Sequence, residues 1–269
     1  RLATIRTAAG HRAVRIDGDR AVETGDADVR GLLERPDWRS HAATAAGPVH
    51  DVAGLDYAPL VPSPEKIICV GLNYRDHVLE MGNELPQYPT VFAKFAPALV
   101  GAHDDIVLPR VSDAVDWEAE LTVVIGTPVR HADPETAQAA IAGYTVLNDV
   151  SVRDYQYRTH QWLPGKNWAR STPLGPFLVT PDEVGLPTVS LDDLRGGELA
   201  PRPVDVLLEP AVQRAELTPR QLTGDVGLGL EGGAVELGAE DVAERVALER
   251  AADRAAEPVH VLEHAVAVV

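Results

Sequence analysis

Two glutamates, one residue apart, stand before the most strand-like run of the sequence. They are Glu118 and Glu120 in Asp116–Gly126, and the continuation Leu121–Ile125 is apolar and rich in β-branched residues, as in a buried strand. Because side chains of a strand alternate between its faces, we expect the two glutamates to point the same way. Two carboxylates at the mouth of a buried strand repel each other unless a positive charge lies between them. A divalent cation is the simplest such charge.

A third carboxylate follows another predicted strand. Tyr144–Leu147 has strand composition and leads into Asn148 and Asp149, so Asp149 is predicted at a strand end, like the two glutamates. Three carboxylates with water form an all-oxygen site, which suits Mg²⁺, Mn²⁺ or Ca²⁺. Zinc is disfavoured because no histidine or thiolate cluster accompanies them. The sequence therefore predicts a metal site made by Glu118, Glu120 and Asp149.

A candidate base and a candidate cation lie closer to the N-terminus. His77 and Glu80 are three residues apart in the predicted helix 74–81, so they share a face and form a general-base pair; the alternative is an exposed contact on a helix surface. Lys94 lies inside the apolar run Pro89–Phe95, where it either extends its ammonium group to water from a strand edge or contacts a substrate carboxylate.

The elements that must position these groups divide the chain near residue 64. Residues 1–64 read as a small β-rich domain ending in a proline-rich linker, and residues 65–269 read as the domain that carries the chemistry. Lys66–Leu72 is predicted as the buried strand before the His77 helix. Toward the C-terminus, residues 239–256 have helical composition and Val259–Val269 is predicted as a final strand.

Composition narrows the possible functions. The chain has 269 residues and a formal net charge of −17, which argues against nucleic acid as a partner. The single cysteine, Cys69, lies in an apolar run and is interpreted as a buried, inert thiol. No apolar run is long enough to span a membrane and no signal peptide is evident, so we expect a cytoplasmic protein without a membrane partner.

With these residues in place, the chain resembles the fumarylacetoacetate hydrolase family, and the resemblance is specific over residues 62–183. It rests on four motifs in the family's order. They are Gly71-Leu72-Asn73-Tyr74 with His77 and Glu80, Asp116-Trp117-Glu118-Ala119-Glu120-Leu121 with Val123–Gly126, Asn148–Gln156, and Gly165-Lys166.

The resemblance implies a fold, a cofactor and a role for each residue. The fold is α+β but mostly β, with a mixed β-roll as catalytic domain, in a homodimer. Mg²⁺ or Mn²⁺, with Ca²⁺ as a further option, is held by Glu118, Glu120 and Asp149. The remaining roles implied are water activation by His77 and Glu80, stabilisation of an oxyanion by Lys166, and substrate or supporting contacts from Arg153 and Gln156. For Arg153 and Lys166, the residues alone leave open an ordinary surface charge.

The implied activity is a metal-dependent hydrolase that cleaves a C–C bond in β-diketo acids, such as acylpyruvates or fumarylacetoacetate-like compounds. The same site also suits an oxaloacetate-type decarboxylase or an isomerase of unsaturated hydroxy diacids. One segment departs from the family pattern: Gly224–Gly233 lacks both threonines and the proline expected there, and it contains Glu231. That departure leaves a non-catalytic, ligand-binding member of the family as a further alternative.

Overall fold

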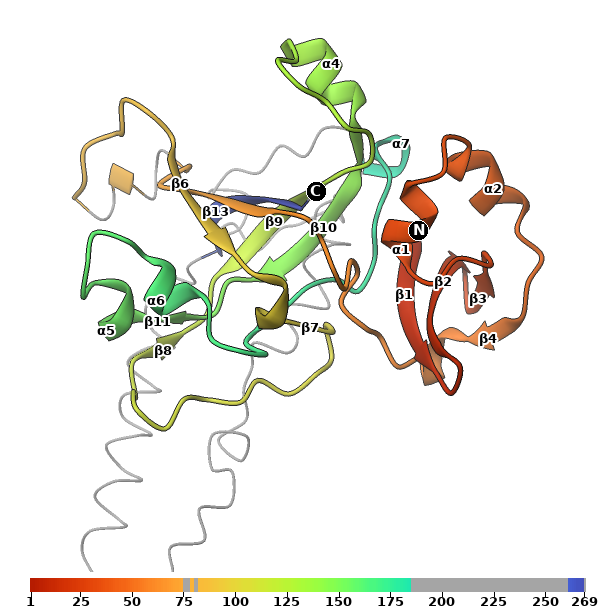
Figure 1. The fold of residues 1–269 in the computed structure, drawn as a ribbon, viewed down its shortest axis with the longest axis horizontal. Helices are drawn as coiled ribbons and strands as arrows, with labels where there is room; N and C mark the ends of the chain where they lie inside the picture. Colours follow the sequence, from red (N-terminus) through yellow and green to blue (C-terminus); the bar gives the residue numbers. More distant parts are fainter. Residues whose placement is uncertain (75–77, 80–81, 185–260, 269) are drawn as a thin grey trace, which may run out of the picture. The chain divides into compact units, whose positions relative to one another are not determined.

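A computed structural model describes residues 1–74, 78–79, 82–184 and 261–268 of the chain (Figure 1). All of these residues belong to one compact unit. The described part is mostly β, as predicted, and its helices are short. The domain boundary proposed near residue 64 stays a prediction.

The N-terminal residues form a four-stranded antiparallel sheet in the order β1-β2-β3-β4. Alternating apolar residues and the turn at Gly18, which has a positive φ of 61°, produce the hairpin between the second and third strands. Two helices connect the third strand to the fourth. The elements are β1 (Leu2–Thr7), β2 (Gly10–Asp17), β3 (Arg20–Glu23), α1 (Val29–Leu33), α2 (Trp38–Thr44), β4 (Val49–Asp51) and the 3₁₀ turn η1 (Val52–Gly54).

The central sheet has five strands in the order β10-β9-β13-β5-β6 and mixes parallel and antiparallel pairs. Its last strand in sequence, β13 (Val261–Val268), runs between β5 (Ile67–Gly71) and β9 (Ala119–Ile125), as the blue arrow in Figure 1 shows. The outer strands are β6 (Thr90–Lys94) and β10 (Ile141–Asn148). The prediction of a final strand is thus confirmed, and the strand joins segments far apart in the sequence.

The remaining elements are short, and some of them carry site residues. Two small pairs, β8 with β11 and β7 with β12, flank it. Asp133 caps the helix that precedes β10, as its place before a proline predicts. The elements are η2 (Ala96–Ala98), β7 (Leu99–Val100), β8 (Val115–Asp116), α4 (Pro134–Ala139), β11 (Ser151–Val152), α5 (Arg153–Gln156), α6 (Leu163–Lys166), β12 (Thr172–Pro173) and α7 (Pro181–Val184).

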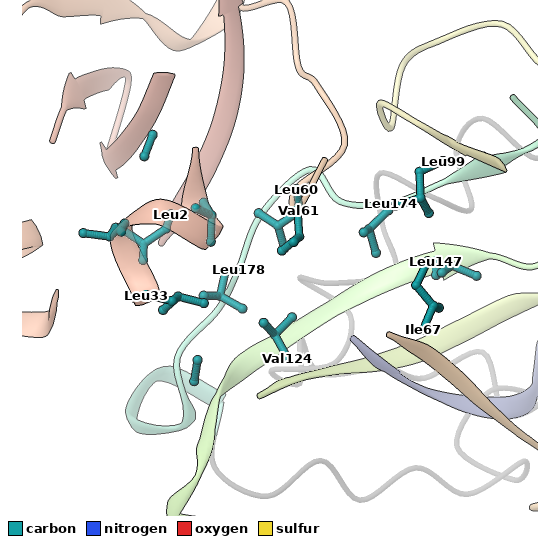
Figure 2. Close-up of a cluster of buried hydrophobic side chains, with 14 of the residues drawn as sticks. Leu2, Leu33, Leu60, Val61, Ile67, Leu99, Val124, Leu147, Leu174 and Leu178 are labelled. Carbon is teal, nitrogen blue, oxygen red and sulfur yellow. The ribbon is translucent and has the colours of Figure 1, made fainter. Parts of the chain in front are cut away.

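One apolar cluster links the N-terminal sheet to the central sheet. Leu2 and Leu33 come from the first 33 residues, while Val124 and Leu147 come from β9 and β10, and all four are buried (Figure 2). The backbones also meet, because Leu2 and Leu178 exchange two hydrogen bonds of 3.0 and 2.8 Å. Burial of apolar side chains of this size stabilises the fold by about 1.5–3 kcal/mol each.

Candidate active site

The three carboxylates predicted to bind metal are all fully buried. Glu118 directly precedes β9, Glu120 is the second residue of β9, and Asp149 directly follows β10; each is 0% exposed. From Glu120 onward the buried positions of β9 are Glu120, Thr122 and Val124, so the side chains alternate between faces there; Ala119 before them is also buried. The Asp149 backbone N–H donates to the Glu118 carbonyl at 2.8 Å, which joins the two strand ends.

A lysine ammonium group bridges two of these carboxylates. Lys166 is the last residue of α6, and its Nζ lies 2.5 Å from Glu118 Oε2 and 3.0 Å from Asp149 Oδ2. Its side chain is fully buried, so an ordinary surface charge is excluded for Lys166. Burial alone would lower the pKa of Lys166, but the charges of Asp149 and Glu118 outweigh burial and hold the pKa above its ordinary value. Lys166 is therefore a charged group at neutral pH.

Lys94 contacts the other oxygen of Asp149. Its Nζ donates to Asp149 Oδ1 at 2.6 Å and also to the backbone carbonyl of Lys166. The side chain is 0% exposed, so the interpretation of Lys94 as a strand-edge lysine reaching water is wrong. Contact with a substrate carboxylate stays a prediction.

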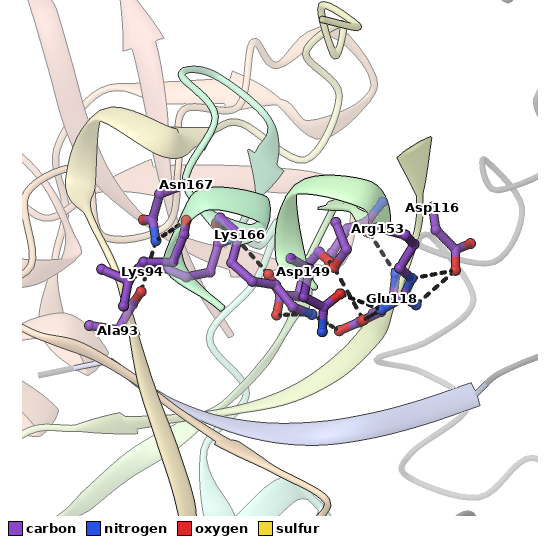
Figure 3. Close-up of polar contacts among 12 residues, drawn as sticks. Ala93, Lys94, Asp116, Glu118, Asp149, Arg153, Lys166 and Asn167 are labelled. Atoms are coloured by element: carbon purple, nitrogen blue, oxygen red, sulfur yellow. Dashed lines mark hydrogen bonds and ion pairs between the residues drawn. The ribbon is translucent and has the colours of Figure 1, made fainter. Parts of the chain in front are cut away.

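Arg153 continues the row of charges outward. Its Nε and Nη2 donate to Asp116 Oδ2 at 3.0 and 2.7 Å, and its Nη1 donates to Glu118 Oε1 and to Gln156 Oε1. Figure 3 shows the resulting alternation of sign along Lys94, Asp149, Lys166, Glu118, Arg153 and Asp116. Arg153 is the partly exposed cation of this row, with 24% of its side chain accessible.

The structure adds contacts that the sequence analysis did not assign. Ser151 Oγ donates to Glu118 Oε1 at 3.1 Å, and Asn148 Oδ1 accepts from the Glu118 N–H at 3.2 Å. Asp116 orients Arg153, as described above. All three residues lie within the motif segments that carry the family resemblance. Their position in these segments indicated that they lie near the site. Sequence spacing, however, does not reveal which side chain a serine or an asparagine contacts.

Two predicted parts of the site lie outside the described residues. These are the pair His77 and Glu80, and the glycine-rich segment Gly224–Gly233. Cys69, on β5, is buried as expected; burial and the nearby Asp149 carboxylate raise the pKa of its thiol, which keeps it protonated. This agrees with the interpretation of Cys69 as an inert thiol.

The three carboxylates have the oxygen donors that a hard divalent cation prefers, although the Lys166 ammonium group lies between two of them. Three buried carboxylates supply only oxygen, the ligand that Mg²⁺, Mn²⁺ and Ca²⁺ prefer. Within the part of the chain that the structure describes, no group of three Asp, Glu, His or Cys side chains stands ready to hold a metal. Lys166 Nζ places a positive charge between Glu118 and Asp149, whereas the sequence predicted one between Glu118 and Glu120. The metal site stays a prediction that this chemistry supports.

Comparison with known proteins identifies the family of this chain. The model of the fumarylacetoacetate (FAA) hydrolase C-terminal domain matches residues 66–204, which is more than half of the chain. The chain belongs to the fumarylacetoacetate hydrolase family. The resemblance found in the four motifs is thereby confirmed.

A curated relative in this family is the human protein named oxaloacetate tautomerase FAHD2A, mitochondrial. It is 45% identical over 148 residues, covering 54% of this chain and 47% of the relative. The chain thus spans about half the length of the curated relatives it matches. The expectation of a cytoplasmic location is contradicted by this comparison, because FAHD2A and its human counterpart FAHD2B are both named as mitochondrial proteins.

Solved structures of the fumarylacetoacetate hydrolase family share the fold. The 5-carboxymethyl-2-hydroxymuconate delta-isomerase from Mycobacterium smegmatis is 31% identical with a TM-score of 0.55, covering 67% of this chain and 66% of the other. The fumarylacetoacetate hydrolase from Exiguobacterium antarcticum is 25% identical with a TM-score of 0.58, covering 68% of this chain and 67% of the other. Relatives within this family are therefore named as tautomerase, isomerase and hydrolase.

Proposed function

We propose that this chain is a metal-dependent tautomerase of a small 2-oxo diacid, with oxaloacetate as the first substrate to test. The names of its relatives support an isomerase more than the C–C hydrolase that the sequence analysis put first, since tautomerases and isomerases recur among them. The observation that carries the proposal is the buried ammonium group of Lys166 between two carboxylates.

The reaction needs little beyond charge placed near one oxygen. In keto-to-enol conversion of oxaloacetate, the C3–H bond breaks, its proton goes to a base, and the C2 oxygen gains a proton. The intermediate is an enolate, so the barrier falls when positive charge lies beside the C2 oxygen. A metal bound by Glu118, Glu120 and Asp149 would act as a Lewis acid toward that oxygen.

The described residues can supply the remaining tasks. Lys166 is charged and water-excluded, so its Nζ–H is suited to donate to the enolate oxygen. Arg153 is partly exposed and suited to hold a substrate carboxylate, with Asp116 and Gln156 fixing its orientation. His77, supported by Glu80, remains the predicted base.

The charges of this site suit an anionic substrate. Among the described residues, the four carboxylates Asp116, Glu118, Glu120 and Asp149 face the three cations Lys94, Lys166 and Arg153. A divalent metal would leave a surplus of positive charge, which an anionic substrate would neutralise. A neutral substrate would leave that surplus uncompensated in a buried site.

The test follows the enol absorbance of oxaloacetate with Mg²⁺ or Mn²⁺ and with a chelator. Pyruvate release and acylpyruvate cleavage are measured in parallel on the same sample. We expect tautomerisation to be the fastest of the three reactions and to stop when the metal is removed. Acylpyruvate cleavage or pyruvate release without tautomerisation would overturn the proposal in favour of a hydrolase or a decarboxylase. Metal binding without any of the three would favour a ligand-binding protein.

Glu118→Gln is the variant that checks the site. The amide keeps the size of the side chain but removes the charge that pairs with Lys166 and Arg153. We expect metal binding measured by calorimetry to weaken by at least about tenfold and tautomerisation to fall with it. Unchanged metal titration would remove Glu118 from the ligand set.

The homodimer implied by the resemblance is tested on the wild-type sample by light scattering, where a mass of one chain would contradict it.

A further inference from the structure

Asp149 is held by two lysines, one on each oxygen. Lys166 Nζ lies 3.0 Å from Oδ2, and Lys94 Nζ donates to Oδ1 at 2.6 Å. The two contacts differ in kind. Lys166 is placed between Asp149 and Glu118, where a cation is expected, whereas Lys94 approaches Asp149 from β6 and also contacts the Lys166 carbonyl.

The backbone around Lys94 is fixed from both sides. Lys94 pairs with Ile67 in the β5–β6 ladder. The side chain of Asn167 accepts from the Phe95 N–H at 2.8 Å and donates to the Ala93 carbonyl at 2.9 Å, as Figure 3 shows for Ala93. The backbone that carries Lys94 is therefore held in place beside Asp149 by both β5 and the residue after α6.

The use of lysine in this chain points to a specific role. The sequence has three lysines against 21 arginines, and two of the three are the buried pair at Asp149. The third, Lys66, is exposed just before β5. Since arginine provides almost all positive charge elsewhere, the buried lysines are not part of a general surface pattern. A compact ammonium group fits between a carboxylate oxygen and a backbone carbonyl where a planar guanidinium would not.

We infer that Lys94 is a positioning residue that keeps Asp149 a one-oxygen ligand and thereby makes the site favour Mg²⁺ or Mn²⁺ over Ca²⁺. Oδ1 accepts the hydrogen bond from Lys94, whereas the buried Oδ2 accepts none although Lys166 Nζ lies 3.0 Å away, so Oδ2 is the oxygen that Asp149 offers to a metal. Ca²⁺ accepts six to eight oxygens and often takes both oxygens of a carboxylate, whereas Mg²⁺ requires an octahedron of single oxygens. Blocking Oδ1 therefore removes a ligand that Ca²⁺ would use and Mg²⁺ would not. This inference rests on the proposed metal site.

The experiment compares Mg²⁺ and Ca²⁺ binding to the full chain by calorimetry, without substrate. The variants are Lys94→Met, which removes the donor but keeps the length of the side chain, and Lys66→Met, the same change at an exposed lysine. Loss of a positive charge affects two divalent ions alike, so the ratio of the two Kd values reports the blocked oxygen and not the charge. We expect Lys94→Met to shift this ratio toward Ca²⁺ by about tenfold. Lys66→Met should leave it unchanged.

The outcomes separate the inference from the proposed function. If neither ion binds the wild-type chain, the proposed metal site fails and the role of Lys94 fails with it. If both ions bind and Lys94→Met leaves the ratio unchanged, the metal site stands and the role of Lys94 is wrong. Thermal unfolding shows whether Lys94→Met is folded; if it is not, Lys94→Gln takes its place, because it is also uncharged and too short to reach Oδ1 in the same way.

Discussion

At the scale of single residues, the site is defined by where Lys166 places its charge. Its ammonium group lies between Glu118 and Asp149, and both carboxylates hold its pKa above the ordinary value against the effect of burial. A metal and this ammonium group therefore compete for the same two carboxylates. Substrate provides a way to relieve the competition, because an enolate oxygen can accept the hydrogen bond that Lys166 donates.

Lys166→Met should separate metal binding from turnover. Without the competing ammonium group, Mg²⁺ should bind more tightly than to the wild-type chain, while kcat falls by about 10²–10³-fold because the enolate loses a donor. Calorimetry gives the first quantity and the enol assay gives the second. Weaker metal binding in Lys166→Met would mean that the lysine supports the ligands and does not compete for them. Lys66→Met again serves as the control at an exposed position.

At the scale of elements, the position of Lys166 depends on the close approach of two short helices. A Cβ added to Gly165 of α6 would lie 2.6 Å from the Cα, Cβ and N of Gln156 in α5, which is closer than such atoms approach. Gly165 is therefore a site of close backbone contact. Only glycine allows α6 to lie near enough to α5 for Lys166 to reach Glu118.

Gly165→Ala should therefore displace α6 and move the neighbouring Lys166 away from Glu118. We expect a loss of about 1–3 kcal/mol in the free energy of unfolding, with a fall in tautomerase activity at saturating Mg²⁺. Urea unfolding and the enol assay measure the two effects. Gly31→Ala in α1 is the matched control, since its nearest contact would be Asp28 Oδ1 at an ordinary 3.7 Å. Equal behaviour of the two variants would remove the steric argument.

A second contact between elements joins β1 to the loop after β7. Arg6 donates to both carboxylate oxygens of Asp104, at 2.9 and 2.5 Å, and Asp104 Oδ2 also accepts from the Gly101 N–H. Burial alone would raise the pKa of Asp104, but these hydrogen bonds outweigh it and hold the pKa below its usual range. The folded state thus favours the charged carboxylate more than the unfolded chain does. The resulting stabilisation is present above the unfolded pKa of about 4 and is lost as pH falls through the lowered value.

Asp104→Asn should consequently cost stability in a pH-dependent way. At pH 7 we expect the free energy of unfolding to fall by about 1 kcal/mol, and the difference from wild type should shrink below about pH 4. Urea unfolding across this range measures it. Asp56→Asn is the comparison, because Asp56 also contacts Arg6 but is more exposed, and it should change stability less. A loss for Asp104→Asn that is constant with pH would contradict the electrostatic account.

The same elements show how far the sequence could predict the structure. The apolar, β-branched run Leu121–Ile125 and the cap at Asp133 are local signals, and β9 and α4 lie where these signals place them. The insertion of β13 between β5 and β9 has no local signal, since strand pairing depends on contacts across more than a hundred residues. The site follows the same division. The buried carboxylates were predicted, but their lysine partners lie 48 and 55 residues away in the chain, where sequence spacing gives no distance.

At the scale of the whole molecule, none of the helices in the described residues is long and apolar enough to cross a membrane. The chain has a net charge of −17, whereas in the site three cations stand against four carboxylates. A dianionic substrate therefore approaches through a repulsive field before it reaches Arg153 and the proposed metal. The range of that field depends on salt, because the Debye length falls from about 30 Å at 0.01 M to about 8 Å at 0.15 M.

We expect kcat/KM for oxaloacetate to rise with ionic strength, by a factor of about 2 to 10 between these two salt concentrations. Screening shortens the repulsion from the distant carboxylates, while the buried row of charges is shielded from salt and keeps its strength. The measurement holds free Mg²⁺ constant and varies potassium chloride, with sucrose at matched osmolarity as the uncharged control. Sucrose should not raise kcat/KM. A kcat/KM that falls with salt would mean that positive charge near the partly exposed Arg153 outweighs the net negative charge of the chain. The substrate would then be attracted, not repelled, at long range.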